Sequence, residues 1–247
     1  MFPQIIGHRG FPYKAPENTM SSYISAVDAG ADGLEIDIHM TKDGELVLIH
    51  DETLDRTTNG SGSVGLCTFK EIRRLNADRR FGGQAKVPAL RDFLERFALS
   101  GLTLIMELKT NKAHYPGIEE KLLGLLNEYG PPAHVIIASF NRNSLITVKR
   151  LDSRMKTGVL FKYRPVSLSR AKSTNVDALF PHFRNMRFVT AKKFAKSGFS
   201  LYPFTVNHLN TMRKMVFYRV SGIITDRCDL LSALKAEHPA SGDDSGR

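Results

Sequence analysis

Short apolar runs alternate with helical segments along almost the whole of this 247-residue chain. The predicted strands are residues 4–7, the first arm of a hairpin over 33–51, and 102–109, 135–140, 158–161, 178–181, 201–206 and 222–225. The predicted helices are residues 20–29, 91–100, 118–129, 143–151, 167–173, 191–197, 209–218 and 230–237. Strands that are separated by helices are typical of a parallel sheet with crossover connections. Eight such repeats predict an α/β fold, the (β/α)8 TIM barrel, whose functional side chains follow the carboxyl ends of the strands.

A doubly wound α/β sheet is the alternative fold for this pattern. It needs a glycine-rich phosphate loop directly after its first strand. The first predicted strand is instead followed by His8-Arg9-Gly10, which is not such a loop. The sequence therefore favours the barrel.

One long segment, residues 51–88, departs from the alternation after the second strand. It is rich in Gly, Thr, Asn and Arg, and long segments of this kind are usually functional or disordered. We interpret it as an insertion that covers the polar end of the hairpin. The rest of residues 1–237 is expected to form a single barrel domain, and residues 238–247 read as a polar, disordered tail.

The composition limits the partners of the chain. It carries 35 Lys and Arg against 25 Asp and Glu, a formal charge of +10, which favours anionic partners. The basic residues are scattered and form no nucleic-acid recognition pattern, so a small anionic substrate or a lipid surface is expected instead. No segment approaches the ~20 apolar residues of a membrane-spanning helix, and the N-terminus lacks a signal peptide, which predicts a cytoplasmic protein. The composition does not predict an oligomeric state.

Acidic residues alternate with aliphatic ones on two of the predicted strands. Glu35 and Asp37 lie two residues apart and therefore share a face, and Glu107 and Lys109 have the same spacing. Because inward positions converge in a barrel, we expect the three carboxylates at one mouth. Clustered carboxylates need a neutralising cation, and an all-oxygen ligand set predicts one Mg²⁺ or Ca²⁺ ion. A solvated strand face is the alternative for the hairpin alone.

Two histidines and two cations end strands of the same set. His8 and His50 could supply an acid and a base near neutral pH. Arg9 and Lys109, together with the ion, could hold a phosphate group and neutralise charge that develops during its transfer. These residues predict phosphoryl-transfer chemistry.

Four other polar residues are not assigned to the catalytic set. His39 shares a face with the carboxylates but reads as a hydrogen-bonded or exposed histidine rather than a metal ligand. His182 is expected at a polar rim. Asn207 and Asp226 either support the site or only cap the helices that follow.

An ordered series of motifs resembles the glycerophosphodiester phosphodiesterase family and extends to about residue 235. The motifs are His8-Arg9-Gly10, Pro16-Glu17-Asn18-Thr19, Glu35-x-Asp37, Thr41-Lys42-Asp43-Gly44, His50-Asp51, Leu54-x-Arg56-Thr57-Thr58, Glu107-x-Lys109, Tyr115-Pro116-Gly117, Ser139-Phe140, Thr205-Val206-Asn207 and Gly222-Ile223-Ile224-Thr225-Asp226. A single triplet of this kind is weak support, but the whole series in order is specific.

The resemblance implies a TIM barrel that hydrolyses glycerophosphodiesters to an alcohol and sn-glycerol 3-phosphate. The matched positions are His8 and His50 for acid–base catalysis, Glu35, Asp37 and Glu107 for a Mg²⁺ or Ca²⁺ ion, Arg9 and Lys109 for phosphate, and Glu17 close to the same site. Residues 51–88 match an insertion that helps to enclose the glycerol end. The family also suggests that the glycerol 2-hydroxyl can attack the phosphorus, with direct attack by water as the alternative.

Two positions depart from the family pattern. Phe204 stands where Trp is common, so the wall near the substrate can differ, and Cys228 stands where Pro often occurs. Neither belongs to the predicted catalytic set. Two further functions stay open: a lysophospholipase D acting on lysophospholipids, and a non-catalytic barrel that binds phospholipid or another anion.

Overall fold

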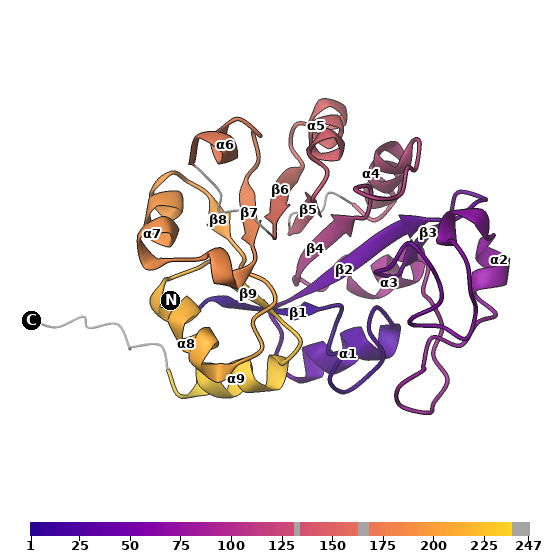
Figure 1. Cartoon of the computed structure of the whole chain (residues 1–247), viewed down its shortest axis with the longest axis horizontal. Coiled ribbons are helices and arrows are strands. Elements are labelled where there is room, and N and C mark those ends of the chain that lie inside the picture. The colour runs from indigo at the N-terminus through magenta and orange to yellow at the C-terminus, as the bar shows by residue number, and fades with distance from the viewer. Residues whose placement is uncertain (131–133, 163–167, 239–247) are drawn as a thin grey trace, which may run out of the picture.

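The computed structural model describes residues 1–130, 134–162 and 168–238. Its strands are β1 (Gln4–His8), β2 (Gly33–Met40), β3 (Leu46–Leu48), β4 (Thr103–Leu108), β5 (Val135–Ser139), β6 (Lys156–Phe161), β7 (Ala178–Pro181), β8 (Ser200–Leu201) and β9 (Gly222–Thr225). The sheet runs β8-β7-β6-β5-β4-β2-β1-β9 with parallel pairing throughout, and β3 pairs antiparallel with β2. Figure 1 shows the helices as an outer ring around these strands. The predicted TIM barrel is confirmed.

The barrel closes between β8 and β9 through backbone hydrogen bonds. The amide of Ser221 donates to the Leu201 carbonyl (2.9 Å), and the amide of Ile224 donates to the Pro203 carbonyl (3.1 Å). β8 itself has only two residues, so the prediction of a strand over 201–206 is too long. Pro203 has no amide hydrogen and interrupts the ladder at this point.

The helices follow the predicted alternation. They are α1 (Met20–Asp28), α2 (Phe69–Ile72), α3 (Leu90–Phe97), α4 (Ile118–Glu128), α5 (Arg142–Leu151), α6 (Leu168–Lys172), α7 (Phe188–Lys196), α8 (Leu209–Phe217) and α9 (Cys228–Ala236). α7 and α9 begin earlier than the predicted residues 191 and 230. Their N-cap residues, Arg187 and Arg227, are not the Ser, Thr, Asp or Asn that mark a helix start in a sequence.

Two predicted features fall wholly or partly outside the described residues. One is the tail, of which only His238 is described, and the other is Ser167, within the helix predicted over residues 167–173. Among the residues that are described, no helix has the length and apolar character that crossing a membrane requires.

Side chains on each strand alternate between the barrel interior and the layer under the helices. The interior cluster consists of Ile6, Ile105, Ile136, Ala138, Leu160, Ala178, Phe180, Tyr202 and Ile224. Their neighbours on the same strands, such as Ile5 and Leu104, pack against the helices. Because side chains two residues apart share a face, His8 follows Ile6 into the interior and Glu107 follows Ile105. The polar positions thus lie above the apolar interior, at the carboxyl ends of the strands.

The insertion, residues 51–88, is an ordered layer with its own small core. It contains α2 and a 3-10 turn, Val64–Leu66, neither of which the sequence predicted. Buried apolar side chains join it to β3 and the residue after it: Val47, Ile49, Leu54, Val64, Ile72, Ala77 and Val87. Figure 1 shows this layer at the edge of the barrel beside β2 and β3. It is fixed to the arm of the hairpin that ends in His50.

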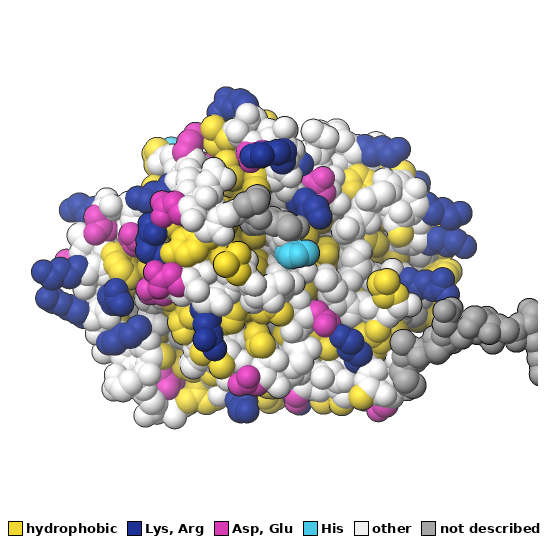
Figure 2. All heavy atoms as spheres, turned by 180° about the vertical axis from the view of Figure 1, so that it is seen from behind, with side chains coloured by type: hydrophobic (Ala, Val, Ile, Leu, Met, Phe, Trp, Pro, Cys, Tyr) yellow, Lys and Arg dark blue, Asp and Glu magenta, His cyan; other side chains and the backbone are white. Residues whose placement is uncertain are grey.

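The basic residues are spread over the surface. On the face in Figure 2, Lys and Arg side chains are scattered from the centre to the edges and are interspersed with Asp and Glu. This distribution agrees with the scatter of basic residues along the sequence. It gives the molecule a positive charge of +10 without concentrating it on that face.

Candidate active site

A cavity of about 470 Å³ opens at the carboxyl ends of the strands. Six predicted site residues line it: His8, Arg9, Glu35, His50, Glu107 and Lys109. Asp37 is buried and contacts two of these residues, Arg9 and Lys109. Glu17 contacts Arg9. The structure therefore brings all eight predicted residues together, and the cavity is large enough for a small ligand.

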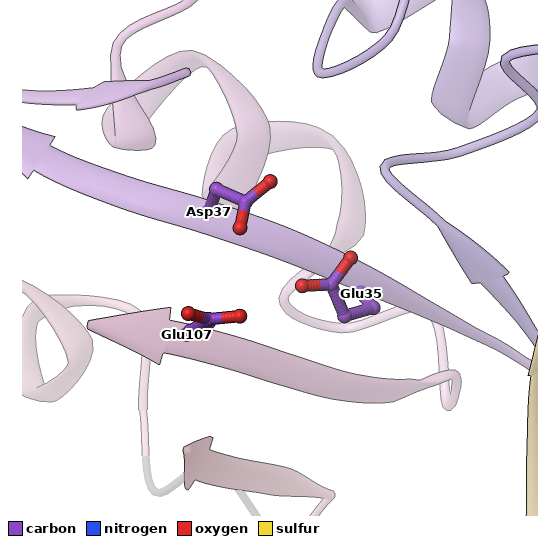
Figure 3. Close-up of side chains that lie close together, drawn as sticks. All are labelled: Glu35, Asp37 and Glu107. Atoms are coloured by element: carbon purple, nitrogen blue, oxygen red, sulfur yellow. The ribbon is translucent and has the colours of Figure 1, made fainter. Parts of the chain in front are cut away.

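Three carboxylates form a buried cluster on neighbouring strands. One oxygen from each of Glu35, Asp37 and Glu107 lies within 4.8 Å of the others, and the residues are only 4%, 1% and 6% exposed. Asp37 is directly opposite Glu107 in the pairing of β2 with β4. Figure 3 shows the three carboxylates gathered over these two strands. The sheet register itself thus produces the cluster.

Two cations partly balance the cluster. Lys109 Nζ lies 2.8 Å from Glu107 Oε1 and 3.3 Å from Asp37 Oδ1, and Arg9 Nε lies 3.1 Å from Asp37 Oδ2. Burial alone raises the pKa of Asp37, but the charges of Lys109 and Arg9 outweigh it and hold that pKa well below its usual range. Burial, followed by the charges of Asp37 and Glu107, raises the pKa of Glu35 well above its ordinary value.

The donor set of this cluster suits a hard divalent cation. Asp37 Oδ1 is buried and makes no hydrogen bond to the described residues, although Lys109 lies at ion-pair distance. Burial also raises the pKa of Glu107 despite the neighbouring lysine, so the two cations do not fully compensate the three acids. Carboxylate oxygens are the preferred ligands of Mg²⁺ and Ca²⁺. Glu35, Asp37 and Glu107 could therefore hold a divalent metal ion.

His8 is held by two residues from the far end of the chain. Its Nδ1 lies 2.6 Å from Asp226 Oδ1, and Asn207 Nδ2 donates to Asp226 Oδ2 at 2.5 Å. Burial opposes ionisation of Asp226, but the hydrogen bond and charge of His8 keep its pKa below the ordinary value. Because a carboxylate only accepts, Nδ1 carries a proton. Asn207 and Asp226, which the sequence left undecided, thus orient His8.

His50 is held in the same way by its neighbour in the sequence. Its Nδ1 lies 2.6 Å from Asp51 Oδ1, and Arg56 Nε donates to Asp51 Oδ2 at 2.6 Å. Burial lowers the pKa of His50, and the positive charges of Arg9 and Lys109 act in the same direction. The neutral form of His50 is therefore favoured near neutral pH.

Glu17 lies behind Arg9 and fixes its guanidinium. Arg9 Nη1 donates to Glu17 Oε1 at 2.8 Å. Burial raises the pKa of Glu17, but hydrogen bonds from Arg56 and the charge of Arg9 bring the net value below normal. The carboxylate is thus ionised and holds the arginine at the cavity wall.

His39 is buried and both of its ring nitrogens have protein partners. Nε2 lies 3.1 Å from the His50 carbonyl oxygen, and Nδ1 lies 2.7 Å from the Tyr115 hydroxyl. A carbonyl only accepts, so Nε2 carries the proton and Nδ1 accepts from Tyr115. This agrees with its interpretation as a hydrogen-bonded histidine. His182 lines the cavity, as expected of a rim residue.

Several supporting contacts were missed from the sequence. Asn18 Nδ2 donates to Asp37 Oδ2 at 2.8 Å, and the Tyr23 hydroxyl donates to Asn18 Oδ1 at 2.8 Å. Asn18 belongs to a motif that was noted, but its partner lies 19 residues away. Only the fold brings the two together.

The molecule is a TIM barrel. A polar cavity opens at the carboxyl ends of its strands and contains carboxylates of the kind that bind metal ions. A family model described as the Glycerophosphoryl diester phosphodiesterase family matches residues 8–230. A glycerophosphodiester phosphodiesterase of Caldanaerobacter subterraneus subsp. tengcongensis is 39% identical, and the match covers 90% of this chain and 93% of that protein. One of Bacillus subtilis is 33% identical, with coverage of 93% and 85%.

A solved structure gives the same result. An Oleispira antarctica phosphodiesterase, in complex with the product sn-glycerol-3-phosphate, has a TM-score of 0.86 and 25% identity, and the match covers 95% of this chain and 97% of that chain. The chain therefore belongs to the glycerophosphoryl diester phosphodiesterase family and is a phosphoric diester hydrolase. The family and the enzyme class predicted from the sequence are confirmed.

The burial of His39 predicts how stability changes with pH. Burial lowers the pKa of His39 from 6.5 to about 4. Between these values the unfolded state binds more protons, so this contribution to stability is complete above pH 6.5 and falls as the pH falls toward 4. From pH 7 to pH 5 the loss from this group is about 2 kcal/mol.

Urea unfolding of the wild type and of His39→Gln at both pH values measures this contribution. The glutamine side chain has no titrating group, so the variant should be less sensitive to the pH change by about that amount. An equal loss of stability in both proteins would show that His39 titrates normally in the folded state.

Proposed function

We propose that the chain hydrolyses glycerophosphodiesters to an alcohol and sn-glycerol 3-phosphate, with one Mg²⁺ or Ca²⁺ ion and with His8 and His50 as acid and base. One observation carries the proposal: a buried carboxylate cluster, two cations and two aspartate-bound histidines converge on one cavity. The product bound to the Oleispira antarctica phosphodiesterase supports the choice of product.

The carboxylates Glu35, Asp37 and Glu107 would hold the ion. When bound, it would supply Lewis-acid stabilisation of the negative charge on the phosphoryl oxygens. The orphaned oxygen Asp37 Oδ1 and the raised pKa values of Glu35 and Glu107, caused chiefly by burial, support this assignment.

Arg9 and Lys109 would bind the phosphate of the substrate. Both line the cavity, and both already contact the carboxylate cluster. Arg9 is positioned by Glu17, and a fixed guanidinium suits the oxygens of a phosphate group. Their positive charge would stabilise the additional negative charge of the transition state.

His8 and His50 would exchange protons with the substrate through Nε2. In each ring Nδ1 faces an aspartate, so Nε2 is the nitrogen left for the reaction. One histidine takes the proton of the attacking hydroxyl and the other protonates the leaving alcohol. Their roles reverse if a cyclic phosphate is formed and then opened by water.

Action on lysophospholipids is the second candidate, and the apolar part of the cavity wall favours it. That wall carries Phe140, Leu160, Phe180 and Phe204. Phe140 and Phe204 pack edge to face, with ring centroids 6.2 Å apart. An apolar wall of this kind could also accept an acyl chain, as a lysophospholipase D would require.

Release of glycerol 3-phosphate from glycerophosphocholine tests the activity and its metal dependence together. We expect chelation to abolish turnover, because three buried carboxylates would be left without their cation, and added Mg²⁺ or Ca²⁺ to restore it. Choline release from lysophosphatidylcholine in parallel separates the two candidates. Full activity in protein shown by elemental analysis to be metal-free would contradict the metal dependence.

Substitution of the histidines and of Arg9 separates chemistry from binding. His8→Ala and His50→Ala should each lower kcat by about 10²–10⁴-fold with a smaller change in KM, because proton transfer stabilises the transition state. Arg9→Ala should change both constants, because its phosphate contact exists before and during the reaction. His134→Ala, an exposed histidine before β5, is the matched control. Near wild-type kcat in both active-site histidine variants would refute the acid–base assignment.

A further inference from the structure

Arg56 in the insertion makes two forked contacts with carboxylates of the site. Its Nε and Nη2 donate to Asp51 Oδ2 and Oδ1 at 2.6 and 3.2 Å. Its Nη1 and Nη2 donate to Glu17 Oε2 and Oε1 at 2.8 and 2.7 Å. The side chain is 47% exposed and, among the described residues, forms no ion pair with Glu35, Asp37 or Glu107. Arg56 therefore contacts residues that support the site rather than the metal-binding acids.

These contacts complete a continuous hydrogen-bonded chain from His50 to Arg9. Asp51 binds His50 Nδ1, and Glu17 binds Arg9 Nη1. Within this chain, Arg56 connects Asp51, the partner of His50, with Glu17, the partner of Arg9. One guanidinium thus sets the relative placement of a proton-transfer group and a phosphate-binding group.

We propose that Arg56 is a positioning residue, through which the insertion aligns His50 and Arg9 on the same substrate. The inference rests on the proposed function, because it assumes the roles proposed there for His50 and Arg9. It assigns no contact between Arg56 and the substrate. It adds a residue that acts through Asp51 on the acid–base step and through Glu17 on phosphate binding.

The chemistry of the side chain fits this role. A guanidinium is planar and has five donors, so it can hold two carboxylates at once in fixed directions. Without it, Asp51 and Glu17 would be neighbouring anions that repel each other and no longer fix their partners. Lysine is a single flexible point charge and would neutralise the pair without orienting both members. Loss of Arg56 is therefore expected to disturb the alignment of His50 and Arg9. A partly exposed ion pair can provide such alignment even where it adds little to the stability of the fold.

A second arginine provides a matched control for anchoring of the insertion. Arg80 also reaches from the insertion to the loop after β1, where Nη1 donates to the Pro12 carbonyl at 3.0 Å. It lies over the rings of Tyr13 and Phe81. Unlike Arg56, it forms no hydrogen bond or ion pair with Asp51 or Glu17 among the described residues. Loss of Arg80 thus removes an anchor of the insertion while the chain between His50 and Arg9 stays intact.

The experiment measures kcat and KM for glycerophosphocholine with Arg56→Ala, Arg56→Lys and Arg80→Ala. Arg56→Ala should lower kcat/KM by about 100-fold, the size expected when reacting groups are misplaced by about 1 Å. It should lower kcat and raise KM together, Arg56→Lys should recover only part of the loss, and Arg80→Ala should change kcat/KM by less than about threefold. Melting temperatures check folding, and Arg56→Gln replaces the alanine variant if that variant is unfolded.

Double variants test whether Arg56 acts through its two partners. Adding Arg56→Ala to Asp51→Asn should lower kcat little further, and adding it to Glu17→Gln should raise KM little further. The reason is that the effects of substitutions within one hydrogen-bonded network do not add. Fully additive losses, or an equal loss in Arg80→Ala, would overturn the proposal.

Wild-type kcat and KM in Arg56→Ala, alongside an inactive His50→Ala, would also overturn it while leaving the proposed function intact. Absence of turnover in the wild-type holoenzyme would instead overturn the proposed function, and this inference with it.

Discussion

The burial of three carboxylates at one end of a barrel is the constraint on which the rest of the site depends. Moving an ionised carboxylate out of water costs several kcal/mol unless other charges compensate. Lys109 and Arg9 compensate mainly for Asp37, and burial and mutual repulsion leave the pKa values of Glu35 and Glu107 raised. The cluster thus favours the binding of a further positive charge, because Arg9 and Lys109 already form ion pairs with it and do not fully compensate it.

Around this cluster, the fold fixes the direction of both histidine rings. His8 is oriented by Asp226, and His50 is oriented by Asp51, with distances of 2.6 Å in both cases. The first pair joins the carboxyl ends of β1 and β9, the first and last strands in the sequence, and the second joins the hairpin to the insertion. The two histidines therefore depend on different parts of the structure, although they face one cavity. One ring is thus held by a residue of the barrel and the other by a residue of the insertion.

The sequence predicted those parts of the structure that depend on local periodicity. A spacing of two residues placed Glu35 with Asp37, and the alternation of strands and helices predicted the barrel that brings Glu107 beside them. It did not predict the partner of His8, because Asp226 is 218 residues away and equally resembles a helix cap. Nor did it predict the contacts of Arg56 with Asp51 and Glu17, which depend on a loop without periodic structure. The shortened β8 and the early starts of α7 and α9 were missed because Pro203 interrupts a ladder and arginines occupy the N-caps.

The most direct test of this account is a crystal structure of the protein with Ca²⁺ and sn-glycerol 3-phosphate. We expect one ion within about 2.3–2.6 Å of oxygens from Glu35, Asp37 and Glu107, the range that Ca²⁺ adopts in proteins. The phosphate should lie beside this ion and within hydrogen-bonding distance of Arg9. An ion bound elsewhere, with the three carboxylates still contacted only by the protein, would contradict the account.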